Sequence, residues 1–123
     1  MASLSHISRV LLMEDEALIA LDVEMALRDA GVSDIVTAFT TDEALGALDQ
    51  HTICAAILDI HVGQTESYDV ARRLRGRGIP FVFSTGTSAE LPEFDDVPLV
   101  LKPYSSDAIV EALSRVTGPS AMA

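Results

Sequence analysis

The chain has 123 residues, of which 49% are hydrophobic, and a formal net charge of −11. Such a composition favours one globular domain of ordinary size. The negative charge argues against nucleic-acid phosphates or anionic membranes as partners, and no apolar run reaches the roughly 18 residues of a membrane span.

We therefore expect one domain over residues 1–123, with a core over 7–117 and a loose tail over 118–123. A cytoplasmic location is expected because the single cysteine, Cys54, cannot form an internal disulfide. The segment MASLSHISR also lacks the apolar core of a signal peptide. Cys54 itself is predicted to be a buried strand residue.

Five apolar runs alternate with helical patterns. They predict strands over 9–13, 34–39, 54–60, 80–85 and 96–102. Helices are predicted over 15–31, 40–50, 67–78 and 105–117, and Pro92 and Pro98 leave room only for a short or broken helix between the last two strands.

Side-chain spacing defines the faces and ends of these helices. Leu18, Leu21 and Met25 form the predicted apolar face of the first helix, and Thr40 with Glu43 has the spacing of a capping box. In the last helix Ser105 is the predicted cap, and the inward residues are Ile109, Leu113 and Val116. Four arginines near the end of the third helix are interpreted as a solvated helix end.

Continuous apolar strands separated by helices indicate a parallel sheet that is covered on both faces. The predicted fold is a doubly wound, flavodoxin-like α/β sandwich with five parallel strands in the order 2-1-3-4-5 and a degenerate fourth helix. In such folds the functional site lies at the carboxyl ends of the strands.

Chemically distinctive side chains stand where these strands end: Glu14, Asp15, Asp59, Thr85 and Lys102. Lys102 is the only lysine, and it cannot balance three carboxylates alone. Oxygen ligands favour a hard cation, Mg²⁺ or Mn²⁺, and Mg²⁺ prefers sites that it shares with phosphate. Because aspartate can accept a phosphoryl group, the arrangement points to phosphoryl transfer. Glu16 is predicted to belong to the start of the first helix.

Other phosphate chemistries fit less well. The phosphate-binding motif G-x-x-x-x-G-K-[ST] is absent. A phosphatase of the haloacid dehalogenase type needs a second aspartate two residues after the nucleophile, where this chain has His61.

The chain resembles the receiver domains of two-component response regulators. The resemblance rests on LLMEDE, AILDIHVG, STG and LKPY, in this order and at the strand ends, and it covers about residues 7–117. It implies that Asp59 is the phosphoacceptor and that Mg²⁺ is bound by Glu14, Asp15, Asp59 and the backbone carbonyl of His61.

The resemblance also assigns the residues after the last two strands. Thr85, followed by Gly86, would be the switch hydroxyl, and Lys102 would pair with the phosphoryl group. The Lys102–Pro103 bond would be cis. Leu99 stands where many receivers have an aromatic residue.

The segment GIPFVFSTGT is similar to the P-F-x-F-A-T-G-Y signature of stand-alone receivers that are partnered with histidine kinases of the HWE/HisKA2 kind. Ser84 and Thr87 replace the usual alanine and tyrosine, and Gly63 replaces a common proline.

The expected function is a phosphorylation switch that takes its phosphoryl group from a histidine kinase or phosphotransferase. Without an output domain it would act by protein binding, as a phosphate sink or as a relay, and it would catalyse only its own phosphorylation and dephosphorylation. A non-switching kinase-binding module and a small Mg²⁺-dependent phosphatase remain alternatives.

Overall fold

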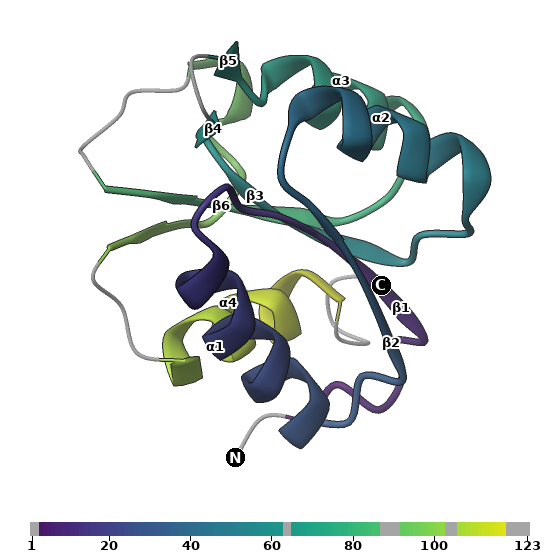
Figure 1. The fold of residues 1–123 in the computed structure, drawn as a ribbon, viewed down its shortest axis with the longest axis vertical. Coiled ribbons are helices and arrows are strands. Elements are labelled where there is room, and N and C mark those ends of the chain that lie inside the picture. Colours follow the sequence, from purple (N-terminus) through teal and green to yellow (C-terminus); the bar gives the residue numbers. More distant parts are fainter. Residues whose placement is uncertain (1–2, 63–64, 87–91, 103–105, 118–123) are drawn as a thin grey trace.

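A parallel sheet with helices on both faces forms the centre of the molecule (Figure 1). The computed structural model describes residues 3–62, 65–86, 92–102 and 106–117. The sheet has the order β2-β1-β3-β6-β7, and every neighbouring pair is parallel, which confirms the predicted topology. Its strands are β1 (Arg9–Met13), β2 (Asp34–Ala38), β3 (Ala55–Asp59), β6 (Phe81–Thr85) and β7 (Leu99–Leu101). The helices are α1 (Ala17–Asp29), α2 (Thr41–Gln50), α3 (Tyr68–Gly76) and α4 (Ser106–Thr117).

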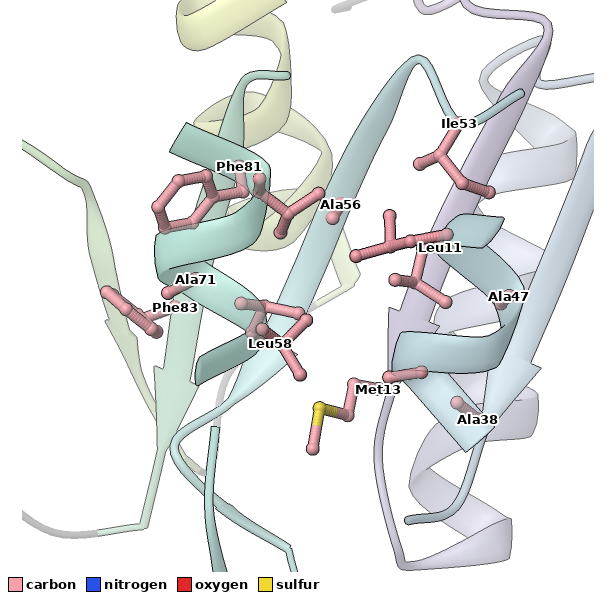
Figure 2. Close-up of a cluster of buried hydrophobic side chains, with 14 of the residues drawn as sticks. Leu11, Met13, Ala38, Ala47, Ile53, Ala56, Leu58, Ala71, Phe81 and Phe83 are labelled. Atoms are coloured by element: carbon pink, nitrogen blue, oxygen red, sulfur yellow. The ribbon is translucent and has the colours of Figure 1, made fainter. Parts of the chain in front are cut away.

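Alternating strand residues divide the core into two layers. Leu11 and Leu58 belong to the cluster under α2 and α3, together with Phe83 (Figure 2). Val10 and Ile57 belong to the cluster under α1 and α4. Because strand side chains alternate between faces, the continuous apolar strands supply both layers at once.

The buried face of α1 differs from the prediction. Ala20, Val23 and Leu27 are its buried residues. Leu18, Leu21 and Met25 are instead 81%, 53% and 58% exposed. Both sets have helical spacing, and the fold buries the set with two small side chains.

The N-cap half of the predicted capping box of α2 is present, and its second hydrogen bond is displaced by one residue. Thr40 Oγ1 accepts a hydrogen bond from the Glu43 N–H at 3.1 Å, as the spacing predicts. The Glu43 carboxylate reaches back to the backbone N–H of Phe39, at 2.7 Å. Glu43 therefore fixes the residue before the cap.

In α4, Ile109 and Leu113 are buried as predicted, whereas Val116 is half-buried. The predicted cap, Ser105, lies outside the described residues.

Between β6 and β7, the described residues contain a short 3-10 helix, η1 (Pro92–Phe94). Phe94 is buried against Phe83, with their ring centroids 5.5 Å apart. The next strand is shorter than predicted. Val97 N–H donates to the carbonyl of Phe94 in a turn, and Pro98 has no N–H for a strand ladder.

The arginines of α3 are exposed, as predicted for a solvated helix end, and they also form ion pairs with neighbouring segments. Arg72 pairs with Glu93 at 2.9 Å, and Arg75 pairs with Asp96 at 2.8 Å. The Arg75 guanidinium also lies 5.0 Å from the centre of the Phe94 ring. These contacts join the segment around η1 to α3.

Two further details differ from the fold that the sequence predicts. A two-stranded antiparallel sheet, β4 (His61–Val62) with β5 (Thr65–Glu66), follows β3. Cys54 precedes β3 and is half-buried, with its sulfur 3.2 Å from the Ser8 hydroxyl, so the prediction of a buried strand residue was wrong.

Candidate functional site

The sheet topology brings the predicted site residues to one edge. Glu14 follows β1, Asp59 ends β3, Thr85 ends β6 and Lys102 follows β7. Glu14, Asp59 and Thr85 are only 2%, 4% and 0% exposed, whereas Asp15 is exposed. The edge therefore holds two buried carboxylates beside one that faces solvent.

Lys102 joins the two buried carboxylates. Its Nζ lies 2.8 Å from Glu14 Oε1 and 2.9 Å from Asp59 Oδ2. Its backbone N–H donates to the Thr85 carbonyl at 2.7 Å, which fixes the start of the side chain beside β6. Burial alone would lower the Lys102 pKa, but the hydrogen bonds that its ammonium donates to Glu14 and Asp59 outweigh burial and raise this pKa. Lys102 is therefore a permanent cation at the site.

One ammonium does not compensate all the negative charge. The pKa of Glu14 is raised to about 7 in total: burial is the largest cause, the Lys102 hydrogen bond opposes it, and the neighbouring Asp59 charge adds to it. A carboxyl group with such a pKa gains from another cation nearby.

The three acids are arranged as a metal site requires. One oxygen from each of Glu14, Asp15 and Asp59 lies within 4.8 Å of the other two. The donors are all hard carboxylate oxygens, and the excess negative charge suits a divalent ion. The residues therefore fit Mg²⁺.

The remaining predicted residues are placed as follows. Glu16 is the N-cap residue of α1, and its N–H donates to Glu14 Oε2 at 3.2 Å. Gly86 is exposed directly after β6, and among the described residues a Cβ added to it would meet no atom within 4 Å beyond its chain neighbours. His61 begins β4 two residues after Asp59, and the metal-binding role of its carbonyl stays a prediction. Pro103 lies outside the described residues.

Ser84 is a site neighbour to which the sequence analysis assigned no role. It is buried and lies opposite Asp59 in the β3–β6 register, and its carbonyl accepts a hydrogen bond from the Ile60 N–H at 2.9 Å. The signal in the sequence was the serine at a position where alanine is usual. Only the strand register shows that this serine lies beside Asp59.

Comparison with known proteins shows the family to which this chain belongs. No protein-family model and no curated protein sequence matches the chain. Among solved structures, SdrG from Sphingomonas melonis Fr1 is 37% identical, with a TM-score of 0.78, and the match covers 88% of this chain and 94% of SdrG. A response regulator receiver protein from Sinorhizobium medicae WSM419 is 27% identical, with a TM-score of 0.78, over 92% of this chain and 96% of that protein. The chain belongs to the response regulator receiver domains.

A third similar structure belongs to a longer protein. The response regulator PhyR from Brucella abortus is 26% identical, with a TM-score of 0.80, over 94% of this chain. The chain spans about half of PhyR, 50% of its length. Family membership makes the chain a response-regulator switch in the general sense, which depends on phosphorylation. In the described part of this receiver domain, no helix has the length and apolar character needed to cross a bilayer.

Proposed function

We propose that this receiver domain accepts a phosphoryl group on Asp59 in a Mg²⁺-dependent reaction and signals through protein–protein binding. The observation that carries the proposal is the contact of Lys102 with both Glu14 and Asp59 in a cluster with Asp15. Three clustered carboxylates, two of them in contact with one ammonium, match what phosphoryl transfer to a carboxylate needs.

Each residue then has a defined task. Asp59 Oδ attacks phosphorus, the bond from phosphorus to the donor nitrogen or oxygen breaks, and an acyl phosphate forms. Glu14, Asp15 and Asp59 would hold Mg²⁺, which would offset charge on the transferring group. Lys102 moves its contact from the Asp59 carboxylate to a phosphoryl oxygen, and Thr85 is the proposed hydroxyl partner of that group.

The proposed donor is a phosphohistidine of a sensor kinase, of the HWE/HisKA2 kind, or of a phosphotransfer protein. The similarity of GIPFVFSTGT to the signature of stand-alone receivers supports this choice. Catalysis would be limited to phosphorylation and dephosphorylation of the chain itself.

One observation favours a second candidate, a kinase-binding module that does not switch. Leu99 is half-buried beside Phe83, where many receivers have an aromatic residue on the last strand. The structure offers another aromatic next to Phe83, which is Phe94 of η1. A route from Thr85 through β6 to Phe94 would let the protein switch without an aromatic at position 99.

Beryllofluoride, which binds an aspartate carboxylate as a phosphoryl mimic, separates the two candidates. SdrG has been solved in a BeF3-activated conformation. With Mg²⁺ and beryllofluoride, we expect NMR shifts at Asp59 and also at Phe94 and along β7. Shifts confined to the acid cluster would support the non-switching module, and no shifts at all would contradict the proposed site. Asp59→Asn is the control without a phosphoacceptor.

A further inference from the structure

A buried hydroxyl group lies beside the phosphoacceptor and has no task in the reaction proposed above. Ser84 follows three apolar residues of β6, and it is 1% exposed. Burying a hydroxyl group is unfavourable unless a polar partner compensates for the lost contact with water. A serine at this position therefore raises the question of which polar group it serves.

The alternation of side chains along the strands directs Ser84 and Asp59 to the same face of the sheet. In β3, Leu58 belongs to the cluster under α2 and α3, so the next residue, Asp59, points toward the other face. In β6, Phe83 belongs to the same cluster, so Ser84 also points toward the face of α1 and α4. The two residues are paired in the β3–β6 register, and paired strands lie about 4.8 Å apart. At this spacing, rotation of the short Ser84 side chain brings its hydroxyl group within hydrogen-bond reach of the Asp59 carboxylate.

The side chain of Lys102 reaches Asp59 past the same strand. Lys102 follows β7, and β6 lies between β7 and β3 in the sheet. The Lys102 Nζ is nevertheless 2.9 Å from Asp59 Oδ2, so its aliphatic stem spans the carboxyl end of β6. Asp59 therefore has two donors on its β6 side, an ammonium and a hydroxyl group.

Phosphorylation affects these two donors differently. In the proposed reaction, Lys102 moves from the Asp59 carboxylate to a phosphoryl oxygen. Ser84 is part of β6 and stays opposite Asp59 in the register. Its hydroxyl group is then in place when the acyl phosphate is hydrolysed and negative charge returns to the Asp59 carboxyl group.

We propose that Ser84 is a catalytic residue for dephosphorylation, and that its hydroxyl group donates a hydrogen bond to the Asp59 oxygen that leaves phosphorus. In this step a water oxygen attacks phosphorus, the bond from phosphorus to the Asp59 oxygen breaks, and the electron pair of that bond stays on the Asp59 oxygen. The protons of the water stay with the released inorganic phosphate. Ser84 keeps its own proton, and its hydrogen bond stabilises the charge that develops on the leaving carboxylate. The inference rests on the proposed phosphorylation of Asp59 and adds a residue that sets the lifetime of the phosphoryl group.

The hydrogen bond has opposite effects on the two halves of the phosphorylation cycle. It stabilises the free carboxylate more than the acyl phosphate, because a charged oxygen is the stronger acceptor. Ser84→Ala should therefore slow hydrolysis of the acyl phosphate by about threefold to tenfold, as expected for the loss of part of a hydrogen bond to a charged group. The same variant should be labelled at least as fast as the wild type. Damage to the fold or to the acid cluster would instead slow the labelling.

The test follows the phosphoryl adduct by intact-mass spectrometry. The full chain is labelled with phosphoramidate and Mg²⁺ and freed from the donor by desalting, and the loss of about 80 Da is recorded over time. We expect slower loss of the adduct from Ser84→Ala than from the wild type. Ser84→Thr keeps the hydroxyl group and should restore a decay rate close to that of the wild type.

Thr37→Val is the matched control, because it removes a different buried hydroxyl group with little change of shape. Thr37 Oγ1 is buried without a hydrogen-bond partner in the described part of the chain. Its strand, β2, is separated from β3 by β1. The adduct on Thr37→Val should therefore decay at the wild-type rate.

Each outcome of the test bears on a different part of the account. Equal decay of Ser84→Ala and the wild type would overturn the role of Ser84 and leave the phosphoacceptor site standing. Equally slow decay of Ser84→Ala and Thr37→Val would assign the effect to the general loss of a buried hydroxyl group, and it would also overturn that role. The absence of any adduct on the wild type would overturn the proposed function, and the role of Ser84 with it.

Discussion

At the scale of single residues, Lys102 connects the two buried carboxylates of the site. It stands within 2.9 Å of both buried carboxylates. A single ammonium shared by Glu14 and Asp59 leaves the site short of positive charge, and the Glu14 pKa of about 7 is the physical sign of that shortage. The titration of Glu14 is therefore coupled to the binding of a divalent cation.

The first prediction concerns pH. The pKa of Glu14 is about 7 in the folded protein, whereas its ordinary value, which applies to the unfolded chain, is 4.5. The metal-free folded state thus holds an extra proton between these values, and its stability falls as pH rises through this window. Mg²⁺ should relieve that loss, so its stabilising effect should grow between pH 6 and pH 8.

Thermal unfolding with and without Mg²⁺ at several pH values measures this effect. Glu14→Gln cannot titrate, and its Mg²⁺-induced shift in Tm should be small and independent of pH in this range. A shift in the variant that grows with pH as in the wild type would assign the effect to another group.

The second prediction separates the adjacent acids. Asp15 contributes an oxygen to the metal cluster, whereas Glu16 is the N-cap residue of α1. Asp15→Ala should abolish Mg²⁺ binding and phosphoryl labelling of Asp59. Glu16→Ala should leave both nearly unchanged. Isothermal titration with Mg²⁺ provides the measurement, and equal effects of the two substitutions would refute the division of roles.

Much of the candidate site could be predicted from the sequence at the level of single residues. The parallel strands bring their carboxyl ends together, so the acids and the only lysine had to meet there. The double contact of Lys102 and the position of Ser84 beside Asp59 could not be predicted. The first depends on side-chain conformation, and the second on the exact strand register.

At the scale of elements, α1 shows where helical periodicity alone is insufficient. Leu18, Leu21 and Met25 satisfy the same spacing as the buried set of Ala20, Val23 and Leu27. Hydrophobicity favours the first set. The second set carries two small side chains, which allow α1 to approach the sheet closely, and this packing is a tertiary property that the local pattern does not contain.

The third prediction concerns η1. Phe94 is buried against Phe81 and Phe83, with ring centroids 6.1 and 5.5 Å away. Phe94→Ala should lower the free energy of unfolding by about 3 kcal/mol or more, because it removes a buried ring and leaves a cavity.

Leu18→Ala is the matched control for this substitution. Leu18 is a large apolar residue that is 81% exposed, so its removal should change stability by less than about 0.5 kcal/mol. Urea unfolding monitored by circular dichroism provides both values. Equal losses of unfolding free energy for the two substitutions would show that the burial of these side chains does not determine their contribution to stability.

At the scale of the whole molecule, the two helical layers differ in their surfaces. In the α2–α3 layer, arginines pair with four of the acids, which are Asp49, Asp69, Glu93 and Asp96. The α1–α4 layer leaves its acids unpaired within the described residues and exposes apolar side chains. The sheet edge that holds Asp59 and Lys102 lies at the carboxyl ends of strands that contact both layers.

The most direct test of the account is intact-mass spectrometry after incubation with phosphoramidate or acetyl phosphate. In the presence of Mg²⁺, the wild type should gain one phosphoryl group, a mass of about 80 Da. Asp59→Asn, and the wild type with the metal removed by a chelator, should gain none. The absence of an adduct on the wild type, under conditions that label a control receiver domain, would contradict the account.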